Sequence, residues 1–192
     1  MSHINSIGAG MYSDLSVAVP LTPPSFLTLD EADFKDLFAT EINSVGGTPA
    51  TDTYVRLKNV REFPAMGTPP NVVNVPVYGQ ATSQQIKGQT DAPSMEIQLN
   101  YVANEWADGT VLGDMVGDGL QYVFRFALLN SLPDGYESDS VGGGAGLGST
   151  ENSMYFWVGK TEALQVTPQL TDANTATVTI TIQSEFSGAY TV

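Results

Sequence analysis

Alternating hydrophobic and polar residues predict several β-strands along this chain. The clearest case is residues 94–101, in which every second side chain is apolar, as in a strand with one buried face. Residues 175–186 repeat the pattern, with Val178, Ile180 and Ile182 on the apolar side and mainly threonine on the other. Further β-prone runs cover residues 54–63, 121–130, 154–159 and 161–168, and a turn is expected at 172–174. The chain is therefore predicted to be mainly β.

Two segments instead show apolar residues at helical spacing. Thr28 and Glu31 have the Thr-x-x-Glu spacing of a capping box, and the apolar pattern that follows predicts a helix over residues 29–42. A second helix is predicted within residues 104–119, although Gly113 weakens it. Helices are therefore expected to be few and peripheral to the strands.

Proline and glycine mark the segments between these elements. Residues 1–27 contain three closely spaced prolines and are predicted to form an extended arm without an inner strand. Residues 64–93 contain five prolines but also β-prone islands, which predicts a protruding hairpin. The glycine-rich run within residues 131–152 lacks the spacing of a phosphate-binding loop, so we interpret it as a flexible connection. We expect an N-terminal part, residues 1–53, and a β domain, residues 54–192.

Composition narrows the possible functions. The 192 residues include 7 Lys and Arg against 21 Asp and Glu, a formal net charge of −14, which disfavours nucleic-acid binding through a basic groove. Cysteine is absent and the one histidine, His3, stands at the N-terminus, which disfavours thiol, triad and zinc chemistry. We therefore expect no enzyme activity, no cofactor and no metal. Without an apolar run of about 18 residues, we also expect no membrane anchor or secretion signal, and synthesis in the cytoplasm.

Three groups of side chains leave alternatives open. Seven carboxylates lie between residues 104 and 139, where a solvated acidic face, a calcium site or a glycosidase pair can be considered. Arg56, Lys58 and Arg61 fall within six residues, either to neutralise nearby acids or to dock on an acidic patch of an identical neighbour. Trp106 and Trp157 suit a core or an interface, with sugar stacking as the alternative.

The order of these parts resembles the tail tube protein, or major tail protein, of long non-contractile bacteriophage tails. The resemblance covers about residues 54–186 and lies in the sequence TYVRLKNVREFP, the excursion ending in KGQTDAPSMEIQLNYV, the strand QYVFRFALL and the threonine-rich C-terminal pair. Contractile-tail and type VI secretion tube proteins are similar. The family implies a β-sandwich or half-barrel with one flanking helix, located in the virion tail. It also implies six copies that join their inner sheets into a β-barrel ring, and rings that stack around a tape-measure protein and end on tail-end proteins.

This resemblance gives the acidic composition a possible role. If each of six copies gives four strands, the barrel would be about 45 to 50 Å across, wide enough for duplex DNA. Six copies at −14 each carry −84, and a wall that repels phosphate would let DNA pass without binding. The alternatives are a β-sandwich binding module, such as a virion decoration or carbohydrate-binding domain, and an acidic glycosidase.

The polar stripes and the excursion supply the candidate residues for these roles. Lumen candidates are Glu96, Gln98, Asn100, Thr177, Thr179, Thr181, Gln183 and Glu185. Inter-subunit candidates are Arg56, Lys58, Arg61, Val72, Val73, Val75, Val77, Tyr78 and Lys87. The arm 1–27 and the excursion 64–93 are predicted to make the contacts between rings.

Overall fold

The computed structural model describes residues 13–19, 29–67, 72–79, 81–82, 84–87, 93–128 and 153–190. Within them the protein is mainly β, as predicted. The strands are β1 (Ser13–Ala18), β2 (Thr40–Glu41), β3 (Thr53–Arg56), β4 (Val60–Glu62), β5 (Val72–Val75), β6 (Gln84–Lys87), β7 (Ser94–Asn100), β8 (Tyr122–Leu128), β9 (Ser153–Thr167), β10 (Thr175–Ile182) and β11 (Ser187–Tyr190). The helices are α1 (Glu31–Leu37) and α2 (Val111–Asp114). Neither described helix has the length or the apolar content needed to cross a membrane.

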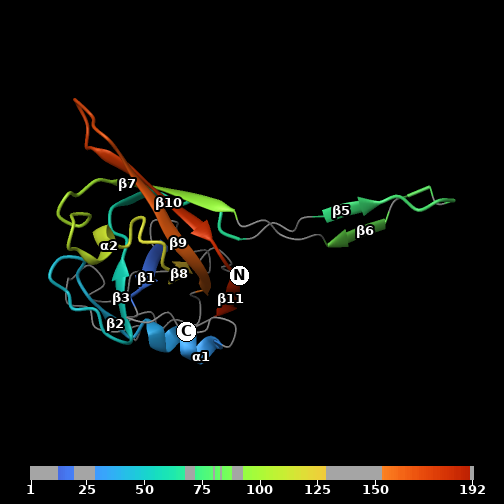
Figure 1. Ribbon diagram of the computed structural model, residues 1–192, viewed down its shortest axis with the longest axis horizontal. Coiled ribbons are helices and arrows are strands. Elements are labelled where there is room, and N and C mark those ends of the chain that lie inside the picture. Colours follow the sequence, from blue (N-terminus) through green and yellow to red (C-terminus); the bar gives the residue numbers. More distant parts are fainter. Residues whose placement is uncertain are drawn as a thin grey trace, which may run out of the picture.

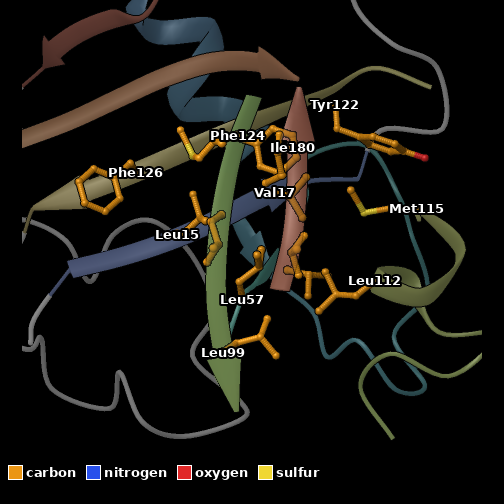
Figure 2. Packing of buried hydrophobic residues seen from close by; sticks show 14 of the residues in the cluster. Leu15, Val17, Leu57, Leu99, Leu112, Met115, Tyr122, Phe124, Phe126 and Ile180 are labelled. Atoms are coloured by element: carbon orange, nitrogen blue, oxygen red, sulfur yellow. The ribbon is translucent and has the colours of Figure 1, made fainter. Parts of the chain in front are cut away.

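Nine of the described strands form one sheet, and β5 and β6 form a separate hairpin. The strand order in the large sheet is β2-β3-β1-β8-β9-β10-β7-β4, with β11 also paired to β9. The pairings are antiparallel except that of β2 with β3. In Figure 1 the β5–β6 hairpin projects away from the body, and Figure 2 shows β7 and β10 crossing over β1 and β8. The predicted protruding hairpin is thus confirmed.

The prediction of an arm without an inner strand is wrong for residues 13–18. These residues form β1, which lies between β3 and β8 and is almost completely buried. The prolines that prompted the prediction begin only at Pro20, whereas Leu15, Val17 and Val19 alternate as a buried strand requires. The large sheet therefore crosses the boundary that the sequence placed at residue 53. Residues 1–12 and 20–27 of the arm lie outside the described residues, as does the glycine-rich segment 131–152.

The strand predicted over residues 54–63 is interrupted. Asn59 has a positive φ of 61°, and the break that it makes separates β3 from β4. Asparagine tolerates this left-handed conformation better than most residues because its short side chain can bond locally. The two runs predicted at 154–159 and 161–168 are instead one long strand, β9, with a bulge opposite Thr179 and Ile180. β11 was not predicted.

Both helices are shorter than predicted. The N-cap of α1 is Asp30, whose carboxylate accepts from the backbone of Ala32 and Asp33, so the capping box pairs Asp30 with Asp33 and the proposed Thr28–Glu31 box is wrong. The helix ends because Thr40 and Glu41 join the sheet as β2. α2 is a single turn, and its Gly113 is required because a Cβ there would overlap the Ala107 carbonyl.

The part of the sheet formed by β3, β1, β8 and β9 has a hydrophobic cluster on each of its two faces. The inner cluster, part of which is drawn in Figure 2, joins β1, β3, β7, β8, β9 and β10. At its centre the rings of Trp157 and Phe124 stack with their centroids 5.7 Å apart. The outer cluster packs Phe34 of α1 and Phe38, the C-cap residue of this helix, against Phe156 of β9. Gly159 lies where β9 passes from pairing with β8 to pairing with β10, and a Cβ there would meet Ile180 at 2.9 Å. The part of the sheet formed by β10, β7 and β4 has a core on its inner face, and neither described helix covers its outer face.

Candidate assembly surface

The uncovered outer face of β10 and β7 gathers most of the lumen candidates. Thr177 lies opposite Gln98, Thr179 opposite Glu96, and Asn100 opposite Thr175, so these side chains share one face. Each is exposed or half-buried, whereas the residues between them are buried. Gln183 and Glu185 follow the end of β10, beyond the last pair of this ladder. The sequence pattern thus located a polar face, and whether it lines a passage stays a prediction.

The same face continues onto the neighbouring strands. Gln165, Ala163 and Lys160 of β9 pair with the outward threonines of β10. On the other side, Glu62 of β4 pairs with Gln98. Among the described outward residues that these strand pairings align, the charged ones are Glu62, Glu96 and Lys160. The face is therefore mainly hydroxyl and amide, with only a weak excess of carboxylate.

Both edges of this four-stranded part, β9-β10-β7-β4, are open within the described part of the chain. β4 pairs with β7 and with no second described strand. β9 pairs with β8 only as far as Gly159, where β10 takes over on the opposite side. The N–H of Gly117 then donates to the Thr161 carbonyl, and from Glu162 to Thr167 no described strand lies on that side of β9. Open edges carry backbone groups that can pair with another chain.

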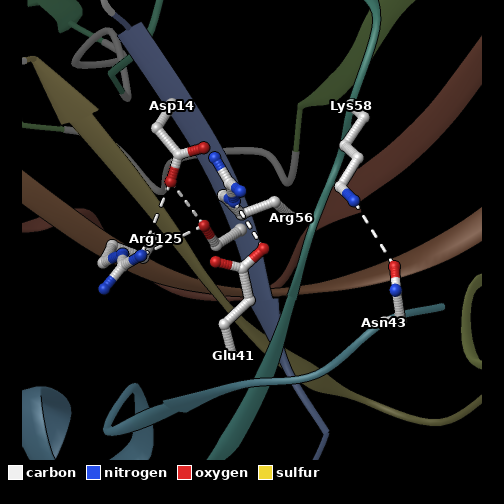
Figure 3. Close-up of polar contacts among 7 residues, drawn as sticks. Asp14, Glu41, Asn43, Arg56, Lys58 and Arg125 are labelled. Atoms are coloured by element: carbon white, nitrogen blue, oxygen red, sulfur yellow. Dashed lines mark hydrogen bonds and ion pairs between the residues drawn. The ribbon is translucent and has the colours of Figure 1, made fainter. Parts of the chain in front are cut away.

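The proposed basic strip is divided between the interior and the surface. Arg56 is buried, and its Nε donates to Glu41 Oε1 at 2.6 Å, which is the local neutralisation that the sequence left open. Lys58 donates to Asn43 Oδ1 at 3.4 Å (Figure 3), and Arg61 is exposed on β4. Burial raises the pKa of the Glu41 carboxyl, and the hydrogen bond from Arg56 opposes this rise only in part. Arg56 is thus part of the interior rather than of a contact surface.

A second buried charge network joins β1 to β8. Arg125 donates through Nη2 to Ser16 Oγ at 3.2 Å and lies 3.5 Å from Asp14 Oδ2, while Ser16 Oγ donates to Asp14 at 2.6 Å (Figure 3). The guanidinium also lies 4.6 Å from the ring centroids of Phe38 and Tyr54. Asp14 and Arg125 are 111 residues apart, so no local spacing in the sequence indicates this network.

The inter-subunit candidates on the hairpin are exposed where their side chains are described. Tyr78 is fully exposed, Val73 and Val77 are exposed, and Val75 is half-buried. Ile86, which the sequence analysis did not select, is also exposed. The side chains of Val72 and Lys87 lie outside the described residues. The hairpin therefore carries apolar side chains that its own fold does not cover.

Two cavities lie at the root of this hairpin and share Pro64, Met66 and Gly67 as a common wall. The first, of about 830 Å³, opens beside Glu96 at the start of β7. The second, of about 370 Å³, is lined by apolar and aromatic residues of β8, β9 and β11 and the residue preceding β11: Phe126, Leu128, Tyr155 and Phe186. Sequence periodicity could not reveal these cavities, because they form where segments distant in the chain meet.

The remaining candidates for chemistry are placed as follows. Trp106 and Trp157 are both buried in the inner core, so neither offers a ring face for stacking a sugar. Asp114 and Asp118 serve local roles, accepting from the Gly109 N–H and the Tyr122 hydroxyl respectively. Within the described residues, no three acidic, histidine or cysteine side chains gather as a metal site would need. Asp134, Glu137 and Asp139 lie outside these residues.

Comparison with known proteins gives a match among solved structures but none among families or curated proteins. A scan of protein-family models finds no match to this chain, and a search of curated proteins finds none. Among solved structures, the chain is similar to that of the SPP1 tail tube, a hybrid structure from solid-state NMR and cryo-electron microscopy. The TM-score is 0.48 and the sequence identity 10%, over 97% of this chain and 81% of that one.

Proposed function

We propose that this protein is a structural subunit that polymerises into a hollow phage tail tube. The observation that carries the proposal is the four-stranded sheet β9-β10-β7-β4. It has a buried inner face, an exposed or half-buried polar outer face and two edges that no further described strand pairs with. A sheet of this kind is incomplete in a single copy, because its edges expose unpaired backbone groups. Joining copies edge to edge closes the sheet into a barrel and removes both edges.

The two open edges are different, which excludes a twofold contact between them. One edge is β4 with the adjoining part of β7, and the other is residues 162–167 of β9. A contact between two unlike surfaces repeats head to tail, so it generates a closed ring or an open helix rather than a twofold dimer. Six copies in a ring, with rings stacked as in the tail tubes that the sequence resembles, satisfy both edges of every copy.

In this arrangement the polar face lines the passage. Its threonine, glutamine and asparagine side chains, with two glutamates and one lysine, provide few cations to bind phosphate. DNA therefore slides past the wall during ejection instead of forming ion pairs with it. The net charge of −14 suggested a strongly acidic wall, but a weakly acidic one is sufficient for this role. DNA binds to a wall through cations, and this face carries few of them.

Electron microscopy of the purified protein tests the proposal. Negatively stained samples at high concentration are expected to contain hollow tubes or rings with sixfold symmetry. Protein that remains strictly monomeric in sedimentation velocity at the same concentrations contradicts the proposal.

A further inference from the structure

The β5–β6 hairpin carries an apolar surface that no other described part of the chain covers. β5 and β6 pair with each other and with no other described strand, and Figure 1 shows the hairpin standing away from the body. Tyr78 at its turn is fully exposed, and Val73 and Ile86 are about half exposed. A two-stranded hairpin without a packed face is marginally stable in water. A partner surface that covers these side chains would stabilise the hairpin.

The charge of this segment indicates what the partner is. Residues 64–90 contain a single charged residue, Lys87, in a chain with a net charge of −14. Two copies of so acidic a protein repel one another over most of their surfaces. Because the hairpin carries no acidic residue, it can contact another copy without this repulsion. We therefore take a second copy of this chain as its partner.

The cavity of about 370 Å³ at the hairpin root is a suitable receiving site. Its wall includes Phe126, Tyr155, Phe186 and the exposed side chain of Leu128, and no charged side chain appears among its described lining residues. A cavity of about 150 Å³ is enough to hold a benzene ring, so this one accommodates the Tyr78 ring together with the neighbouring Val77. Tyrosine seated in an apolar pocket is a frequent anchor of protein interfaces.

A copy cannot fill its own cavity. Pro64, Met66 and Gly67 form both the root of the excursion and one wall of the cavity. The turn between β5 and β6, which contains Tyr78, lies at the far end of the hairpin (Figure 1). The tip of one copy can reach only the cavity of the next. Such a contact is head to tail and repeats along a polymer.

We infer that the Tyr78 turn of one subunit inserts into the Leu128–Phe186 cavity of a neighbouring subunit and links successive copies. This inference rests on the proposed function, in which copies of the chain polymerise. The surface that receives the hairpin is the cavity of about 370 Å³, which is not evident from the sequence or from the strand order.

Disulfide trapping tests the contact cleanly, because the chain has no cysteine of its own. The Tyr78→Cys, Leu128→Cys double variant is expected to give a ladder of covalent multimers after oxidation, seen on a denaturing gel without reductant. Met66→Cys in place of Leu128→Cys provides a second pair, should the first variant fold poorly. The matched control is Tyr78→Cys with Leu120→Cys, since Leu120 is also half exposed but lies outside the cavity. It is expected to give no ladder.

The outcomes separate this inference from the proposed function. Tubes without a ladder, or a ladder equally strong in the Leu120→Cys control, overturn the contact and leave the tube proposal standing. A ladder without tubes supports the contact and contradicts the tube. Absence of both contradicts both.

Discussion

Arg125 places a positive charge inside the sheet, against the rings of Phe38 and Tyr54 and beside Asp14. Both charged side chains are more than nine-tenths buried. A buried ion pair adds little net stability over an apolar pair, but removing one partner leaves an uncompensated charge. The network therefore fixes how β1 joins β8 more than it stabilises the fold as a whole.

We predict that Arg125→Met destabilises the protein by about 3–5 kcal/mol, because Asp14 remains buried without its partner. Chemical denaturation at neutral pH measures this loss. The Asp14→Asn, Arg125→Met double variant removes the stranded charge and is expected to recover part of the stability. A single variant within about 1 kcal/mol of wild type would show that the network does not constrain the fold.

The raised pKa of the Glu41 carboxyl should make the stability of the folded protein depend on pH. Burial raises its pKa above the ordinary value of 4.5, so the folded state binds the proton more tightly than the unfolded state. The stabilising contribution of this proton is complete below pH 4.5 and is lost as the pH rises through the raised pKa. Wild type should therefore gain stability relative to Glu41→Gln as the pH is lowered through this window. Denaturation of both proteins across the pH series checks it, and a pH-independent difference refutes it.

At the scale of elements, alternation and composition predicted much of the sheet but not its connections. The inward positions of β7 and β10 followed from a period of two, and the hairpin followed from islands of β-prone residues between prolines. β1 was missed because prolines downstream of Val19 outweighed three correctly spaced apolar residues. The pair of Arg56 with Glu41 depends on the parallel register of β2 and β3, which local spacing does not encode.

Hydrogen exchange of the open edges tests the proposed joint between copies. Successive backbone groups of a strand point to opposite sides, so about half of the amides in residues 162–167 lack a strand partner in a single copy. We expect these residues and β4 to gain protection on assembly, measured by mass spectrometry of monomer and polymer. The helix α1 serves as the internal control, and its exchange should not change. Equal exchange of both edges in the two states would locate the joint elsewhere.

At the scale of the whole molecule, the acidic residues are not concentrated on the polar face. Asp30, Glu31, Asp33 and Asp36 lie on and beside α1, and Asp108, Asp114 and Asp118 lie around α2. The uncovered face of β7 and β10 carries mainly uncharged polar groups. Among the described residues, carboxylates are thus more numerous around the helices than on this face, and in the proposed tube the wall would avoid binding DNA through its scarcity of cations.

Adding cations to this face should make DNA stick. In assembled tubes of the Thr177→Lys, Thr179→Lys variant, short duplex DNA is expected to be retained in a form resistant to nuclease, with retention falling as salt rises. The control Ala32→Lys, Ala39→Lys adds the same charge on and beside α1 and should retain only nuclease-sensitive DNA. Nuclease-resistant DNA in wild-type tubes at the same level would disprove the account of the wall.

The direct test of the central claim is a cryo-electron microscopy reconstruction of the assembled protein. The account predicts a hollow tube of sixfold rings in which Thr177, Thr179 and Gln98 line the bore and α1 lies on the outside. A tube whose bore is lined by α1, or an assembly in which the edges of β9 and β4 remain unpaired, contradicts it.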